Sequence, residues 1–68
     1  MKQIVFEVTE SPEGGYEGAA LTHRIYTQGD DWNDLKLMVQ DAVRCHFPDE
    51  ERPAMIRLML VREEVLAA

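Results

Sequence analysis

The chain has 68 residues, the size of one small domain, which leaves no room for a catalytic domain beside a regulatory one. A domain this short buries only about 60% of the surface that its unfolded chain exposes, so its core is thin. Hydrophobic residues make up 46% and charged residues 29% of the chain, which is too apolar for a disordered protein. A net charge of −6 repels phosphate backbones and anionic lipids, so we expect no direct contact with nucleic acid or membrane.

The cysteine content and the N-terminal sequence indicate the compartment. Cys45 is the one cysteine and cannot form an internal disulfide, whereas a secreted domain of this size would need several. The N-terminus passes directly into alternating residues and holds no apolar run long enough for a signal peptide or a membrane span. We therefore expect a cytoplasmic protein.

The first half of the chain predicts three strands. Apolar and polar residues alternate from Ile4 to Glu10, which predicts a strand with one buried face. The segment Ser11–Gly15 holds a proline and two glycines and predicts a hairpin loop. A second strand follows over Tyr16–Leu21, where the small residues of 18–20 indicate a close neighbour. His23–Gln28 is rich in β-branched and aromatic residues and predicts a third strand.

The second half predicts one helix and a last strand. Asp31 is expected to cap a helix that Pro48 stops. At 100° per residue one side of this helix carries the apolar stripe Trp32, Leu35, Val39, Ala42, Val43 and His46. An acidic loop over 48–53 leads to the run Met55–Val61, which is apolar on both of its faces.

The predicted order β-β-β-α-β defines an α+β domain. If the helix forms a right-handed crossover, the last strand lies parallel to the first, and the four-stranded mixed sheet has the order 3-2-1-4. An edge strand that is apolar on both faces invites pairing with another chain, so we expect a homo-oligomer or a dedicated partner. The residues predicted to form this interface are Leu37, Met55, Arg57, Met59 and Val61.

No residue pattern predicts catalysis, a metal site or a cofactor. Cys45 and His46 are adjacent, but neighbouring helical side chains point about 100° apart, and the C-terminal end of a helix disfavours a thiolate. His46 is expected to pack in the stripe and to stabilise the last carbonyls of the helix. His23 is expected on the surface, with no zinc-ligand spacing to His46. The acidic residues are expected mostly in loops, caps and exposed faces, and we expect no enzyme activity.

Two short segments carry a resemblance to a known family. Glu13-Gly14-Gly15-Tyr16 follows the first strand, and Thr27-Gln28-Gly29-Asp30 precedes the capped helix. In these positions the chain resembles the HicB-like antitoxins, whose sheet and helix are similar to a truncated ribonuclease H fold. The resemblance spans nearly the whole chain. The chain has Leu21-Thr22-His23-Arg24 where typical members have a Pro-Gly-Cys segment.

The resemblance implies a single HicB-like domain over residues 1–68 that binds another protein. Family antitoxins usually carry a C-terminal DNA-binding module, and we expect no such domain here. The function implied is a non-enzymatic, antitoxin-like module that neutralises a small basic ribonuclease toxin. The alternatives are a self-associating structural or regulatory scaffold and, third, a degenerate metal-dependent nuclease.

Overall fold

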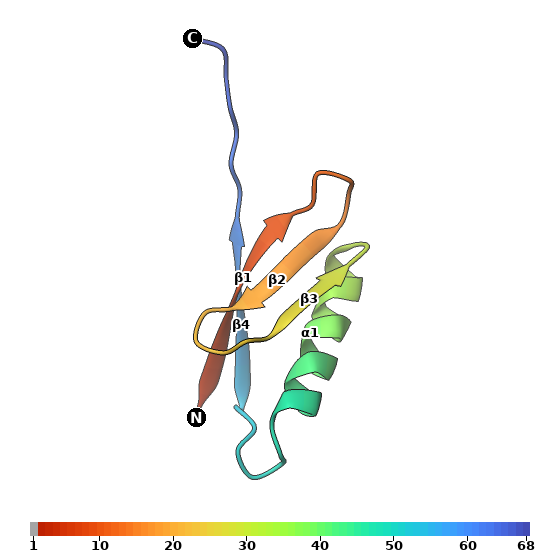
Figure 1. Cartoon of the computed structure of the whole chain (residues 1–68), viewed down its shortest axis with the longest axis vertical. Coiled ribbons are helices and arrows are strands. Elements are labelled where there is room, and N and C mark those ends of the chain that lie inside the picture. The colour runs from red at the N-terminus through yellow and green to blue at the C-terminus, as the bar shows by residue number, and fades with distance from the viewer. Residues whose placement is uncertain (1) are drawn as a thin grey trace.

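The computed structural model describes residues 2–68 as a mixed sheet with one helix packed on one of its faces (Figure 1). The elements are β1 (Gln3–Glu10), β2 (Tyr16–Ala20), β3 (Tyr26–Gly29), α1 (Trp32–His46) and β4 (Met55–Val61). The four strands have the order β3-β2-β1-β4. The predicted fold class, element order and sheet order are therefore confirmed.

Strand β1 is central because it pairs on both of its sides. It is antiparallel to β2, with Phe6 opposite Ala20, and parallel to β4, with Phe6 opposite Leu58. Parallel neighbours need a long connection, which α1 and its flanking loops supply. This crossover leaves β4 at one edge of the sheet and β3 at the other.

The hairpin between β1 and β2 depends on two glycines. Gly14 and Gly15 have φ angles of 98° and 83°, a left-handed conformation that side chains disfavour. The amide of Ser11 donates to the carbonyl of Gly15, and the amide of Gly14 donates to the carbonyl of Ser11, each at 3.0 Å. These bonds close the predicted loop and set the β1–β2 register.

Helix α1 begins with two reciprocal hydrogen bonds. The carboxylate of Asp31 accepts from the amide of Asp34 at 2.7 Å, as predicted for the N-cap. The carboxylate of Asp34 in turn accepts from the amide of Asp30 at 2.9 Å. The amide of Asp34, which the helix leaves free, is thus satisfied together with the amide of Asp30 before the cap, and both acids lie at the positive end of the helix dipole.

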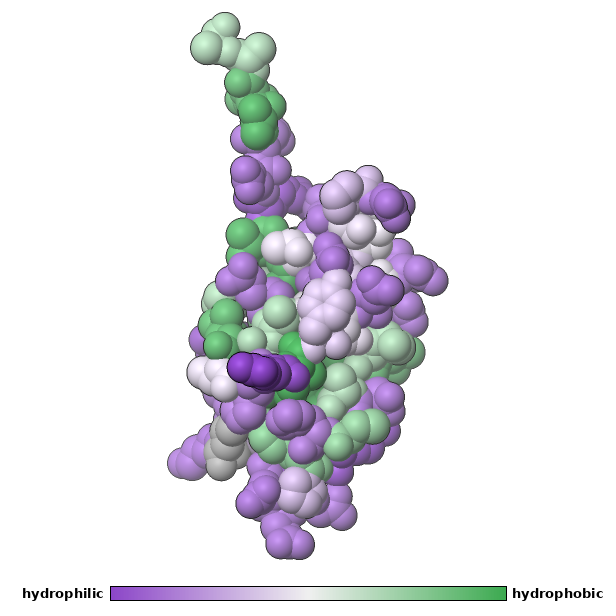
Figure 2. All heavy atoms as spheres, in the orientation of Figure 1, coloured by the Kyte–Doolittle hydropathy of each residue, from purple (hydrophilic) through white to green (hydrophobic). Residues whose placement is uncertain are grey.

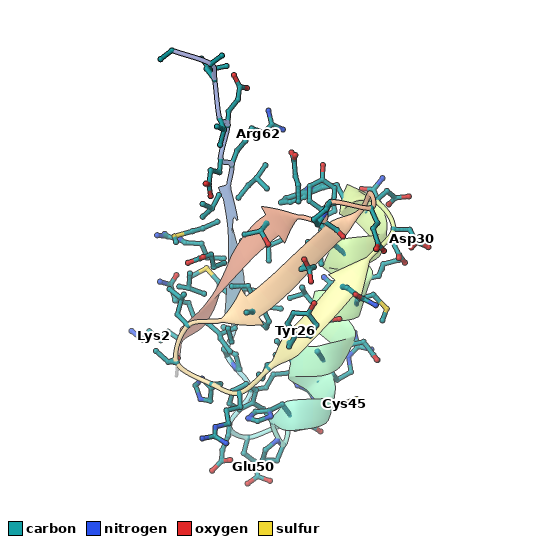
Figure 3. All side chains as sticks on the ribbon, turned by 45° about the horizontal axis from the view of Figure 1, so that its top comes forward. Lys2, Tyr26, Asp30, Cys45, Glu50 and Arg62 are labelled. Atoms are coloured by element: carbon teal, nitrogen blue, oxygen red, sulfur yellow. The ribbon has the colours of Figure 1, made fainter. Side chains whose placement is uncertain are left out.

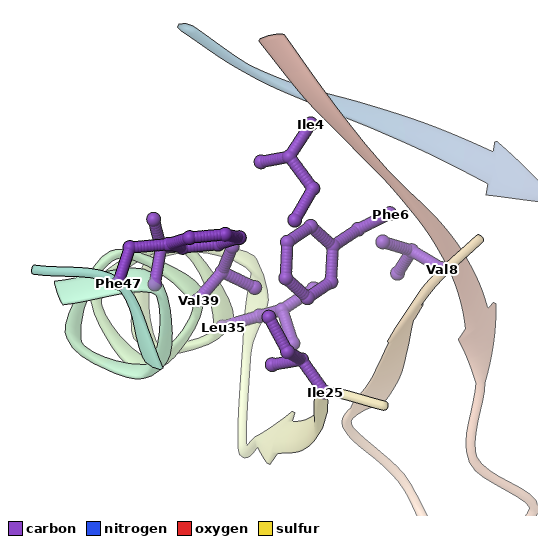
Figure 4. Packing of buried hydrophobic residues seen from close by; sticks show 8 residues of the cluster. Ile4, Phe6, Val8, Ile25, Leu35, Val39 and Phe47 are labelled. Carbon is purple, nitrogen blue, oxygen red and sulfur yellow. The ribbon is translucent and has the colours of Figure 1, made fainter. Parts of the chain in front are cut away.

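The core lies between α1 and the sheet (Figure 4). Its buried side chains are Ile4, Phe6, Val8, Ile25, Leu35, Val39, Val43 and Phe47. The helix packs against β2 at Gly18, where a Cβ would stand 3.7 Å from the side chains of Leu35 and Val39, an ordinary contact distance. The close neighbour predicted for residues 18–20 is therefore the helix.

Two predictions about local structure are wrong. The third strand begins at Tyr26 rather than at His23, because the chain turns widely after β2 and the carbonyl of Ile25 accepts a bond from the amide of Ala20. His46 is exposed, and Phe47 is the residue that is buried at the end of the helix. A carbonyl of the last helical turn, that of Arg44, accepts from Arg52 at 3.4 Å.

The C-terminal residues 62–68 continue beyond β4 as an extended segment away from the sheet (Figure 1). Arg62 holds its start, since Nε and Nη2 donate to one carboxylate oxygen of Glu10 at 3.1 and 2.7 Å. Val65 and Leu66 beyond it are 87% and 77% exposed, and apolar colour marks the tip of the segment in Figure 2. An exposed ion pair of this kind contributes at most about 1 kcal/mol.

Gly29 and Gly18 form a matched pair for testing how closely α1 packs. A Cβ at Gly29 would lie 2.4 Å from the backbone nitrogen of Leu35, whereas one at Gly18 meets only side chains at ordinary contact distance. Gly29→Ala should lower the free energy of unfolding by about 2 kcal/mol or more, and Gly18→Ala should change it by less than about 1 kcal/mol. Urea unfolding followed by circular dichroism measures both, and equal losses would contradict the close approach at Gly29.

Candidate protein-binding surface

Four of the five predicted interface residues lie together on β4. Met55, Arg57, Met59 and Val61 alternate along the strand, on the sheet face opposite to the core side chains. The fifth, Leu37, is 64% exposed on α1. Since α1 covers the other face of the sheet, Leu37 lies in a different layer, and the structure does not bring it together with the four residues of β4.

Strand β4 carries exposed apolar side chains on both of its faces. On the uncovered face Met55, Met59 and Val61 are 60%, 40% and 44% exposed. On the helix-facing side Ile56 and Leu58 pack against the core, but Leu60 stays 43% exposed. The helix lies closest to β3 and β2, which explains why it leaves the far end of β4 open.

The uncovered face of β1, β2 and β3 forms a shallow acidic hollow. Its lining includes Glu7, Thr9, Glu17, Ala19, Leu21 and Tyr26. Tyr26 projects from β3 (Figure 3), and its hydroxyl donates a hydrogen bond to the carboxylate of Glu17. Tyr26 is 61% and Leu21 55% exposed. An exposed aromatic ring that shares a hollow with two carboxylates suits a contact with a cationic protein surface.

The hydrogen bond to Glu17 raises the pKa of Tyr26 above its ordinary value of 10.0. This hydrogen bond is the largest cause of the raised pKa, and it acts by favouring the protonated phenol. Desolvation and the charge of Glu17 also raise the pKa. The stabilisation of the folded protein by this bond is complete below the pKa that Tyr26 has in the unfolded chain. It is lost as the pH rises through the pKa of Tyr26 in the folded protein.

Two histidines that are far apart in sequence meet at the C-terminal end of α1. The rings of His23 and His46 stand edge to face, with their centroids 5.8 Å apart. The ring of Phe47 packs against both, at 5.1 Å from His23 and 4.9 Å from His46. The sequence shows no zinc-ligand spacing between His23 and His46, and in the structure the two rings meet each other and Phe47 at the end of the helix.

The remaining candidate groups stand apart from one another. Cys45 is a free, exposed thiol on α1. Within residues 2–68, no three side chains of His, Cys, Asp or Glu lie close enough together to hold a metal ion. In the same part of the chain no helix is long and apolar enough to cross a membrane.

These features define a small α+β domain with an unpaired apolar edge strand and an acidic open face. The chain belongs to the UPF0150 family. It is 42% identical over 66 residues to a UPF0150 protein of Thermotoga maritima, covering 97% of this chain and 93% of the relative. It is 46% identical over 52 residues to a UPF0150 protein of Archaeoglobus fulgidus, covering 76% and 77%. No family model matches the chain, and the search of solved structures gave no significant match.

Sequence patterns missed part of this surface. Leu60 shares a face of β4 with Ile56 and Leu58, and its exposure follows from the position of the helix, which no local pattern encodes. Tyr26 was assigned only to a strand. The signal that could have found it is the strand alternation, which places Tyr26 and Gln28 on the face opposite to the buried Thr27.

The hydrogen bond between Tyr26 and Glu17 has a spectroscopic test. Glu17→Gln removes the carboxylate, so the pKa of Tyr26 should fall towards its ordinary value. Absorbance of tyrosinate across an alkaline titration measures this, and Tyr26→Phe identifies which step belongs to Tyr26. An unchanged step in Glu17→Gln would show that the phenol does not depend on this carboxylate.

Proposed function

We propose that the chain is a non-enzymatic protein-binding module of HicB type that acts like an antitoxin, covering a small basic ribonuclease. The observation that carries the proposal is the hollow on the uncovered face of the sheet, which Glu7 and Glu17 line together with the exposed Tyr26 and Leu21. The resemblance of the hairpin and helix entry to HicB-like antitoxins supports the same assignment.

Charge favours a basic partner over other classes of ligand. The net charge of −6 attracts a cationic protein over a distance of about 10 Å at ordinary salt and repels its RNA substrate. A toxin that binds RNA presents a basic surface to it. An acidic module that covers this surface would compete directly with the RNA, so inhibition would need no chemistry from the module itself.

The geometry of the open face favours a protein partner over a small molecule. The hollow is shallow and is spread across three strands, whereas small ligands are held in deep, mostly enclosed clefts. Tyrosine is enriched among residues that dominate protein interfaces, because it offers a large rigid ring with a polar tip. Tyr26 and Leu21 would supply the apolar contact, and the carboxylates would supply specificity.

The match to the Thermotoga maritima relative extends over 97% of this chain. The matched region makes up 93% of the Thermotoga maritima protein, so little of that protein lies outside it. This supports a module that works through its sheet and helix.

The test is recovery of the partner from native cells, followed by a growth assay. The tagged chain should retain a small basic protein at low salt and release it at high salt, because their attraction is electrostatic. Expression of that protein alone should degrade RNA and arrest growth, and co-expression of this chain should restore growth. Failure to recover a basic protein at low salt, or failure to restore growth, would refute the antitoxin-like role.

Two charge-reversal variants separate local contact from overall charge. Glu7→Lys with Glu17→Lys alters the open face, and Glu50→Lys with Glu51→Lys makes the same change of net charge in the exposed loop before β4. We expect the first pair to weaken binding by about 100-fold or more and the second by about tenfold or less. Equal losses would indicate that the partner does not contact the open face.

A further inference from the structure

We propose that two copies of this chain associate by antiparallel pairing of β4 with β4 of the second copy. In this pairing Leu58 lies opposite Leu58 of the second copy, and the two four-stranded sheets become one sheet of eight strands. The inference concerns self-association alone and stands independently of the basic partner. It rests on the direction of the backbone groups of β4, on the side chains that the strand carries, and on the position of its single charge.

The free edge of β4 presents the backbone groups of its even-numbered residues. The amide of Met55 donates to the carbonyl of Lys2 at 3.1 Å, so the groups of Met55 point towards β1. Because these groups alternate along a strand, the odd-numbered positions of β4 face β1. The amides and carbonyls of Ile56, Leu58 and Leu60 therefore point to the open edge and lack a partner in the sheet.

Within residues 55–61 the edge strand carries one feature of the kind that usually protects against pairing, the charge of Arg57. Proline, bulges and inward-pointing charges are the usual means. Residues 55–61 hold no proline, pair with β1 in continuous register, and carry one charged side chain, Arg57. Met59, Leu60 and Val61 are each at least 40% exposed, which leaves apolar surface on both sides of the strand for a second copy to bury.

The register follows from the hydrogen bonds. In an antiparallel pair, residues directly opposite either exchange two hydrogen bonds or exchange none, in alternation. With Leu58 opposite itself, Ile56 lies opposite Leu60 of the second copy, so all outward-pointing groups of the strand fall in hydrogen-bonded pairs. The whole of residues 55–61 is then paired. A shift in either direction leaves part of the strand unpaired.

The charge of Arg57 favours the same register. When the strand pairing is centred on Leu58, Arg57 lies opposite Met59 of the second copy, and Met55 lies opposite Val61 of the second copy. If the strand pairing were centred one residue earlier, Arg57 would lie directly opposite Arg57 of the second copy. Like charges opposite each other destabilise a pair of strands. The helix-facing side then holds only leucine and isoleucine across the new contact.

The position of α1 leaves room for this pairing. The helix lies closest to β3 and β2, on the far side of β1 from β4. Two copies related by a twofold axis perpendicular to the sheet would place their helices on the same face of the joined sheet. Leu60 of each copy, which its own helix leaves exposed, would pack beside Ile56 of the other.

The test uses two single-cysteine variants in a Cys45→Ser background. Arg57→Cys and Met59→Cys change exposed side chains of the uncovered face, so neither threatens the core. In the proposed register residue 57 of one copy and residue 59 of the other form a non-hydrogen-bonded pair with Cα atoms about 4.5 Å apart, within reach of a disulfide. The distance between the two residues 57, or the two residues 59, is about 7–8 Å.

Under mild oxidation the amount of disulfide-linked dimer should therefore be about tenfold higher when the two variants are mixed than when either variant is alone. Cross-linking of Arg57→Cys alone or Met59→Cys alone to the same extent would overturn the register, and no cross-linking in the mixture would overturn the proposal. Circular dichroism checks that each variant is folded.

Sedimentation of the unmodified protein gives an independent readout. Two copies that each carry −6 repel, so high salt should strengthen the dimer, whereas it should weaken the complex with a basic partner. A monomer at every salt concentration refutes the dimer and leaves the basic partner untouched. A dimer without any basic partner refutes the proposed function and leaves the pairing of β4 intact.

Discussion

The architecture depends on one constraint, which is that a single helix must cover a sheet of four strands. Helix α1 has 15 residues and is therefore about 22 Å long. It buries the inner side chains of β1, β2 and β3 and reaches only the first half of β4, where Ile56 and Leu58 join the core. The exposure of Leu60 follows from this incomplete coverage, whereas the open edge of β4 follows from the strand order.

Local sequence patterns were sufficient to predict the elements that are encoded by residues within a few positions of one another. The alternation of Ile4, Phe6 and Val8, the glycine pair of the hairpin and the cap at Asp31 each encode structure in their immediate neighbourhood. The sheet order also followed, because a helix between two strands of one sheet restricts the chain to a right-handed crossover in nearly all cases.

Features that depend on contacts between distant segments could not be predicted in this way. His23 and His46 meet because the wide turn after β2 lies beside the end of α1, and no spacing in the sequence encodes that contact. Because of the same turn, β3 begins at Tyr26 rather than at His23. The four predicted interface residues of β4 share one face of the strand because of its alternation, whereas Leu37 belongs to a helix whose outer side faces away from the sheet.

The parallel pairing of β1 with β4 also determines how the domain resists mechanical force. The N-terminal strand begins at one end of the sheet, and the C-terminal strand ends at the other (Figure 1). A pull on the two termini therefore shears β1 against β4 and loads all hydrogen bonds between them at once, whereas peeling would break them one by one. A small domain with a thin core should thus unfold under tension more slowly than its modest equilibrium stability alone suggests.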